Sequence, residues 1–124
     1  IQQSYVFFLF GSGLSRLGFT EFKGALAENA ILQLLEPQFD EKPFYWTSGN
    51  KAEIDFLIQT ASQIIPAEVK SEKRVSGKSL SVYNKKFGPE VRIRFSLNNL
   101  HFENGLINIP VFLADWSKKI IAMN

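Results

Sequence analysis

The chain has 124 residues, a formal net charge of +2 and no cysteine. This length and a hydrophobic fraction of 45% predict a single domain, residues 1–124, with one packed core. The lack of cysteine excludes a disulfide framework, a zinc–thiolate site and a thiol nucleophile, and it favours a cytoplasmic location. No apolar run approaches the roughly 20 residues of a membrane-spanning helix, so we expect a soluble protein without a membrane partner.

The first third of the chain predicts one short apolar segment and one helix. The run 6–10 ends at a glycine turn and indicates a buried strand or an interface segment. A helix is predicted from Thr20, a suitable N-cap, to Glu36, which precedes a proline. Glu28 lies at the margin of the apolar, core-facing stripe of this helix. An acidic side chain at that position calls for a specific role. The predicted core residues are Ala27, Ala30, Ile31, Leu34 and Leu35.

Three strands are predicted in the middle of the chain. Residues 44–46 are aromatic, and a turn leads from them into the alternating run 52–58. A second run, 64–70, follows a short polar stretch, so the two runs predict an antiparallel hairpin with its tip near Ala61 and Ser62. Side chains two residues apart in a strand share one face of the sheet, which is why the polar residues of this hairpin can meet.

The register of this hairpin would place Asp55 opposite Glu68, with Lys70 on the same face. Directly opposed residues have Cβ atoms about 5 Å apart, and like charges at that distance repel each other unless a positive charge lies between them; a divalent cation fits that position. Mg²⁺ or Mn²⁺ prefers oxygen ligands and is often held by one or two carboxylates together with water. Glu28 and the main-chain carbonyl of Val69 are candidate further ligands. The Lys70 ammonium could orient an attacking water or meet charge developing on a phosphate.

The second half predicts two helices and further strands. A basic loop, 71–77, leads to a helix with an apolar face that ends at Gly88. A strand over 91–96 and a tight hairpin at Asn104-Gly105 follow. Pro110 suits the first position of a closing helix. The residues predicted to pack in these helices are Leu80, Tyr83, Phe87, Phe112, Leu113, Trp116 and Ile120. Trp46 is likewise assigned to packing, and His101 to a strand.

Basic residues gather in the middle of the chain, where few acids oppose them. We select Lys73, Arg74 and Lys78 as candidate contacts to a nucleic-acid backbone, because lysine and arginine neutralise phosphates by displacing counterions. DNA is therefore a predicted partner. The alternative reading of the same cluster is a solvated basic face without a specific ligand.

The order of these residues is informative beyond their individual chemistry. A helix with Glu28, a strand with Asp55 and the sequence Glu68-Val69-Lys70 resemble the PD-(D/E)xK nuclease superfamily. More narrowly, the segments 24–29, 45–46, 53–58 and 66–71 are similar to the C-terminal domain of a bacterial and archaeal family of AAA-type ATPases. The similarity runs from about residue 4 to the end of the chain.

The resemblance implies a restriction-endonuclease-like three-layer α/β/α sandwich with a central mixed sheet. It implies Asp55 and Glu68 as ligands of Mg²⁺ or Mn²⁺, Lys70 as the catalytic lysine and Glu28 as an accessory acid. Two positions depart from the family pattern. Thr47 stands where a basic residue is common, and the usual acid near Gly11 is missing, which affects the expected DNA contacts and N-terminal packing.

The resemblance also implies a parent ATPase domain that precedes this one. The chain contains no Gly-x-x-x-x-Gly-Lys-Ser/Thr loop for nucleotide binding, and it does not begin with Met, so we interpret it as a C-terminal fragment of a longer ATPase chain. Two functions stay open at this point: a metal-dependent DNA phosphodiester hydrolase, and a non-catalytic domain that docks DNA, a protein or the parent ATPase. The oligomeric state is also open.

Overall fold

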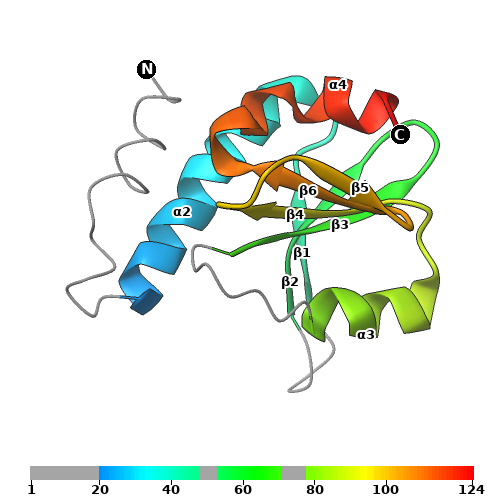
Figure 1. The fold of residues 1–124 in the computed structure, drawn as a ribbon, viewed down its shortest axis with the longest axis horizontal. Coiled ribbons are helices and arrows are strands. Elements are labelled where there is room, and N and C mark those ends of the chain that lie inside the picture. Colours follow the sequence, from blue (N-terminus) through cyan, green and yellow to red (C-terminus); the bar gives the residue numbers. More distant parts are fainter. Residues whose placement is uncertain (1–19, 48–52, 71–77) are drawn as a thin grey trace.

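The computed structural model describes residues 20–47, 53–70 and 78–124, and the side chains of 26–44, 53–70 and 78–124. The predicted segment 6–10 and the side chain of Trp46 lie outside these ranges. The described chain is an α/β fold in which helices flank a mixed sheet (Figure 1). Its elements are α2 (Thr20–Leu35), η2 (Glu36–Gln38), β1 (Phe44–Thr47), β2 (Glu53–Gln59), β3 (Ile64–Val69), α3 (Lys78–Phe87), β4 (Arg92–Ser96), β5 (His101–Glu103), β6 (Leu106–Pro110), η3 (Val111–Trp116) and α4 (Ser117–Ala122).

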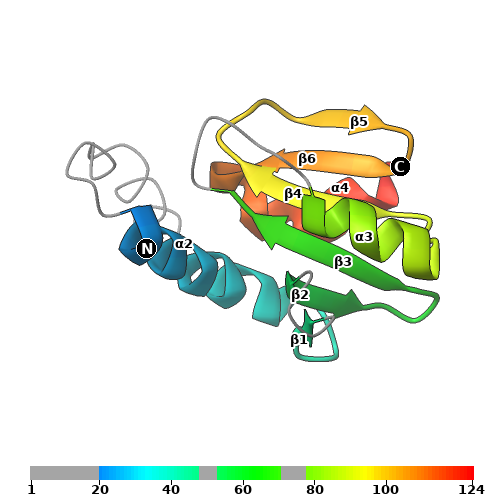
Figure 2. The same ribbon diagram turned by 90° about the horizontal axis from the view of Figure 1, so that it is seen from below.

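The sheet has six strands in the order β1-β2-β3-β4-β6-β5 (Figure 2). β1, β2 and β3 are joined as antiparallel neighbours, β3, β4 and β6 run parallel, and β5 returns antiparallel along β6. A parallel pair needs a long crossover, which explains why α3 separates β3 from β4. The predicted mixed sheet is confirmed, and so is the antiparallel hairpin predicted for the runs 52–58 and 64–70, which form β2 and β3.

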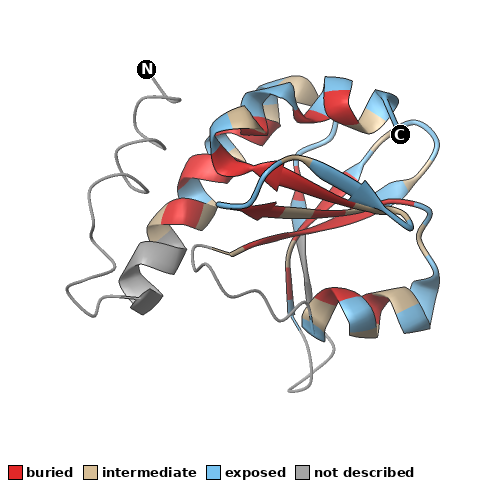
Figure 3. Cartoon of the chain, in the orientation of Figure 1, coloured by how far each residue is buried: buried red, intermediate tan, exposed pale blue. Residues whose placement is uncertain are grey.

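The core is divided by the sheet into two unequal parts. The larger cluster lies on the side of α2 and η3, where residues such as Ile31, Ile58 and Phe95 are completely buried. The smaller cluster lies under α3 and is formed by Ile54, Leu57, Leu80 and Tyr83, with Leu106 packed against it. Figure 3 shows the inner strands as buried and β5 as exposed. Burial on both faces is expected of central parallel strands.

α2 is close to its predicted form. The helix begins at Thr20 and ends at Leu35, and one turn of 3₁₀-helix that contains Pro37 continues it. Proline cannot donate the hydrogen bond that an α-helix needs at that point, so the chain tightens and then leaves the helix. All five predicted core residues of α2 are buried.

The closing helix differs from its prediction. Pro110 is the last residue of β6, and the following turns, Val111–Trp116, are 3₁₀-helix, with α-helix only from Ser117. A 3₁₀-helix has three residues per turn, so every third residue is buried: Val111, Ala114 and Ser117.

Phe112 and Trp116 were assigned to packing on an α-helical period, and that assignment is wrong. In the 3₁₀ period they fall outside the buried positions, and they are 51% and 48% exposed. The Lys119 ammonium lies 4.8 Å from the Trp116 ring centroid, so this indole contacts a cation at the surface. Leu113 is partly buried and Ile120 is buried, as predicted.

α3 and the tight hairpin follow their sequence signals closely. Leu80 and Tyr83 are buried, as predicted, whereas Phe87 is 52% exposed and does not pack into the core. The centroid of its ring lies 4.7 Å from that of Tyr83, so the two rings still share one face of the helix. The hairpin between β5 and β6 turns at Asn104 and Gly105, both with positive φ, which is the backbone that an Asn-Gly turn provides. His101 lies in β5, as predicted.

No helix in the described part of the chain is long and apolar enough to cross a membrane.

Candidate functional site

Asp55 lies where the regular geometry of β2 is interrupted. Phe44 pairs with Leu57 and Trp46 pairs with Ile54, so two steps along β1 correspond to three along β2. The interruption is visible in the packing, because Ile54 and Leu57 belong to the α3 side whereas Phe56 belongs to the α2 side. Such irregularities re-aim side chains and are common beside functional sites.

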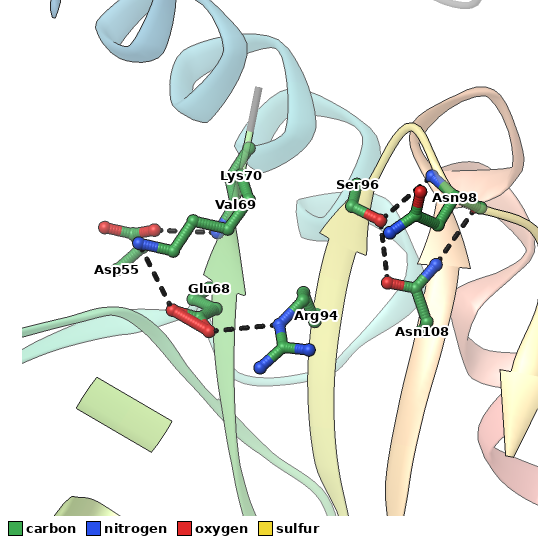
Figure 4. A network of polar contacts seen from close by, with 8 residues as sticks. All are labelled: Asp55, Glu68, Val69, Lys70, Arg94, Ser96, Asn98 and Asn108. Carbon is green, nitrogen blue, oxygen red and sulfur yellow. Dashed lines mark hydrogen bonds and ion pairs between the residues drawn. The ribbon is translucent and has the colours of Figure 1, made fainter. Parts of the chain in front are cut away.

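The carboxyl group of Asp55 fills the gap at the end of the β2–β3 hairpin. The N–H of Lys70 donates to the carbonyl of Phe95 in β4, so the N–H of Val69, one residue earlier, points the other way, toward β2. Asp55 Oδ2 accepts that N–H at 2.7 Å (Figure 4). A side-chain oxygen thus takes the place of a backbone carbonyl at this end of the sheet.

Glu28 reaches the same carboxyl from α2. Burial of Asp55 and a hydrogen bond with the Glu28 side chain raise the pKa of Asp55 to about 8, against the opposing effects of the Val69 N–H and the Lys70 charge. The predicted accessory acid is therefore in contact with the predicted metal ligand. Its place at the margin of the apolar stripe is explained by this contact.

Glu68 is a buried carboxylate held by two cations. Its Oε1 lies 3.6 Å from Lys70 Nζ, and its Oε2 lies 3.3 Å from Arg94 Nε. The register of the parallel strands sets Arg94 directly beside Glu68. A buried charge is tolerated only when it is paired, and these two contacts supply the pairing. Arg94 was missing from the predicted site, because sequence alone does not give the register of strands that a helix separates.

The arrangement differs from the predicted face-to-face pair of Asp55 and Glu68. Ala67 and Val69 belong to the α2-side cluster, so alternation places Glu68 on the α3 side, whereas Asp55 lies in the gap between strands and contacts Glu28. The cause is the irregularity in β2, which removes Asp55 from the regular alternation. Lys70 links the two acids, since it pairs with Glu68 and its charge also acts on Asp55.

The donor atoms fit a divalent cation only in part. Within the described residues, no group of three or more aspartate, glutamate, histidine or cysteine residues is placed to hold a metal ion. Two carboxylates are still sufficient for Mg²⁺, which usually keeps several waters. Asp55 and Glu68 would be those two, with Glu28 and the Val69 carbonyl as the other oxygens near the site.

Of the three predicted nucleic-acid contacts, the structure describes only Lys78. Lys73 and Arg74 lie outside the described residues. Lys78 is the first residue of α3 and is exposed. Farther along the sheet, Arg92 donates from Nη2 to the Asn104 carbonyl at 2.7 Å, so this guanidinium contributes to fixing the hairpin.

A second polar cluster, not predicted from the sequence, lies at the ends of β4 and β6. Ser96 donates to Asn108 Oδ1 at 2.7 Å, and the Asn108 amide donates to the Asn98 carbonyl (Figure 4). The same amide also donates to the Asn99 carbonyl. Ser96 Oγ also accepts the N–H of Asn98. Every group in this cluster is used to fix the loop after β4, so we assign it to structure. The polar residues Ser96, Asn98 and Asn99 were the sequence signal for it.

Comparison with known proteins gives one match. The family model DUF4143, described as a domain of unknown function, matches residues 23–113. This range contains all the acids of the candidate site and Lys70. No curated protein and no solved structure matches the chain.

Proposed function

The chain belongs to the DUF4143 family of domains, and on that premise we propose that it is a nuclease-like domain attached to an AAA-type ATPase, with a metal-dependent site for DNA phosphodiester hydrolysis. DUF4143 domains are typically found with AAA ATPases, which supports the ATPase part. The observation that supports the nuclease part is the position of Lys70 at the end of β3, where it pairs with Glu68 and its charge also acts on Asp55. These three residues have the order and spacing of the PD-(D/E)xK superfamily, and a restriction-endonuclease-like arrangement of the fold belongs to the same proposal.

The proposal assigns Asp55 and Glu68 to a Mg²⁺ or Mn²⁺ ion, with Glu28 and the Val69 carbonyl as accessory oxygens. When bound, such an ion polarises a phosphoryl oxygen and makes a coordinated water more acidic. Lys70 is assigned to the phosphate, where its ammonium meets negative charge as it develops. Lys78, with Lys73 and Arg74, is assigned to the flanking DNA backbone.

Arg94 has a defined part in this proposal. In the structure only its Nε contacts Glu68, and the far end of the guanidinium points away from that carboxylate (Figure 4). A guanidinium presents several donors in a fixed plane, so Arg94 can keep Glu68 in place and still offer N–H groups to a phosphate. We assign it as a positioning residue for Glu68.

The test is cleavage of plasmid, linear and branched DNA with Mg²⁺ or Mn²⁺. Asp55→Asn, Glu68→Gln and Lys70→Met are each expected to lower the rate by about 10²-fold or more, the effect of removing one group that stabilises developing charge. Glu103→Gln and Lys118→Met are the matched controls, because both side chains are exposed and lie away from the site. Cleavage that persists unchanged in Asp55→Asn and Lys70→Met would refute these roles.

A second candidate function is favoured by a specific observation. Both oxygens of Glu68 already have cationic partners, which is the arrangement of a site that needs no metal. In that case the domain docks DNA, a protein or the parent ATPase and does not cleave. Titration calorimetry with Mn²⁺ separates the two functions. Heat that is lost in Asp55→Asn and in Glu68→Gln supports the hydrolase, and no heat in the unmodified protein supports docking.

A further inference from the structure

A pocket of about 230 Å³ opens beside the candidate site. It lies between α2 and the first two strands of the sheet. Its walls include Glu28, Asn29 and Leu32 from α2, Phe44 from β1, and Asp55 and Phe56 from β2. The volume is below the about 300–1,000 Å³ typical of pockets that enclose a drug-sized ligand. A single planar ring system is therefore a better match for it than a whole nucleotide.

The lining of the pocket is chemically mixed. Leu32 and Phe56 supply apolar surface, and Phe44, which is 43% exposed on the edge strand β1, supplies an aromatic side chain. The lining also includes the acids Glu28 and Asp55 and the amide residue Asn29. A flat group with apolar faces and polar edges would match both kinds of lining residue, and a nucleobase has that form.

Asp55 is shared between this pocket and the candidate site. Its carboxyl accepts the N–H of Val69 and is influenced by the charge of Lys70, and it also lines the pocket. A group in the pocket and a phosphate at Lys70 would thus lie on either side of one carboxyl. In a DNA strand, a base and the phosphate next to it have this relation.

We propose that the pocket receives one unpaired nucleobase next to the phosphate that is cleaved. This inference rests on the proposed function and adds a substrate class: DNA that is single-stranded or frayed at the cleavage point. In an intact duplex the faces of a base are stacked and its edge is paired, so the base can enter a pocket only after it is extruded, which costs free energy. An already unpaired base avoids that cost.

The polar lining residues predict which bases are accepted. Carboxyl and amide oxygens accept hydrogen bonds, and adenine, cytosine and guanine each carry an exocyclic amino group that donates them. Thymine has no such group, and its one ring donor, N3–H, lies between the carbonyl oxygens O2 and O4, which acceptor oxygens repel. We therefore expect thymine to be the weakest of the four bases in this position.

The test measures binding in EDTA, so that cleavage does not interfere. Fluorescence anisotropy compares an intact duplex with the same duplex carrying one unpaired adenine, cytosine, guanine or thymine, and with one carrying an abasic site. The unpaired adenine, cytosine and guanine are expected to bind roughly tenfold more tightly than the duplex, consistent with the stacking of one base on an aromatic side chain. The abasic DNA is expected to lose this gain.

The decisive variant is Phe44→Ala, which is expected to reduce the preference for an unpaired base to near unity. Phe102→Ala is the matched control, because Phe102 is also a partly exposed aromatic residue (37%) on an edge strand, at the other side of the sheet. It should keep the full preference. Asn29→Ala provides a second variant if Phe44→Ala does not fold, and it should weaken the discrimination against thymine.

The outcomes separate the pocket from the proposed function. Equal affinity for duplex and unpaired DNA, or an unchanged preference in Phe44→Ala, overturns the pocket inference even if the protein cleaves DNA. A preference that depends on Phe44 in a protein that never cleaves supports the pocket and refutes the hydrolase. If a lysine-rich peptide saturates the pocket while the unpaired base has no effect, the occupant is a cationic side chain and the inference fails.

Discussion

Asp55 shows how one side chain can belong both to the architecture and to the chemistry of a protein. Its oxygen completes the β2–β3 hairpin through the Val69 N–H, and the same carboxyl contacts Glu28 and lines the pocket. Burial and the hydrogen bond with Glu28 raise its pKa to about 8, far above the value near 3.9 of an unfolded chain. The folded protein therefore holds a proton there that the unfolded chain releases.

This pKa predicts a pH-dependent stability. Because the folded-state pKa is the higher one, the contribution of Asp55 is fully present below about pH 4 and is lost as the pH rises through about 8. Urea unfolding in EDTA between pH 5 and 9 is expected to show a free energy of unfolding that falls with pH, by at most about 1.4 kcal/mol per pH unit.

Asp55→Asn is the matched variant for this prediction, since an amide has the same shape and does not ionise. Its free energy of unfolding is expected to lose the Asp55-dependent slope and to exceed that of the unmodified protein most clearly near pH 9. A difference between the two proteins that stays constant from pH 5 to 9 would contradict the elevated pKa.

At the scale of single elements, the turn between β5 and β6 is the most constrained. Gly105 has a φ of +82°, and a Cβ there would lie 2.6 Å from the Glu90 carbonyl oxygen. Gly88, which ends α3, has a φ of +57° and open space around the same position. The two glycines thus share a left-handed backbone and differ in steric room.

Substitution of these two glycines separates backbone strain from steric conflict. Gly88→Ala is expected to cost about 1 kcal/mol of unfolding free energy, the penalty of a left-handed alanine. Gly105→Ala is expected to cost about 2–3 kcal/mol, because the backbone must also move away from Glu90. Urea unfolding of both variants measures this difference. Equal losses of unfolding free energy would show that the hairpin backbone shifts away from Glu90 without a further energetic penalty.

Elements were predictable where local chemistry determines them. The α2 core residues, the 53–59/64–69 hairpin and the Asn104-Gly105 turn all follow from short-range patterns. The 3₁₀ form of the closing helix was not predictable, because 3₁₀ and α periods cannot be distinguished over six residues that contain both apolar and polar side chains. Phe112 and Trp116 were misplaced for that reason.

The candidate site was predictable in its members but not in its contacts. Asp55, Glu68 and Lys70 follow from the spacing along two strands, and in the structure Lys70 pairs with Glu68 and acts electrostatically on Asp55, whereas the two acids do not face each other as predicted. The part of Arg94 depends on the register between β3 and β4, which α3 and its preceding loop separate in sequence. The contact of Glu28 with Asp55 depends on how α2 lies on the sheet. Such long-range placements need tertiary packing.

At the scale of the whole molecule, the two faces of the sheet are unequally stabilised. The α2 side holds most of the buried apolar residues, whereas the α3 side holds a cluster of four. Regions with few buried apolar contacts open more readily than the rest of a protein. Among the helices that the structure describes, α3 should therefore open most readily.

Hydrogen exchange followed by mass spectrometry tests this asymmetry. Amides of α3 are expected to exchange at least about ten times faster than those of β3 and β4, because they open locally without unfolding of the sheet. Leu80→Ala should accelerate exchange in α3 alone, whereas Ile31→Ala, in the larger cluster, should destabilise the whole domain. Equal protection of α3 and the central strands would contradict the prediction.

The bond between Asp55 and Val69 has a further consequence. A ligand that binds the Asp55 oxygen competes with the Val69 N–H for it. Such a ligand therefore weakens the last hydrogen bond between β2 and β3. By thermodynamic reciprocity, any change that strengthens this hydrogen bond must lower the affinity for the ligand by the same factor. Ligand occupancy at Asp55 and backbone order at the end of the β2–β3 hairpin are therefore governed by the same equilibrium.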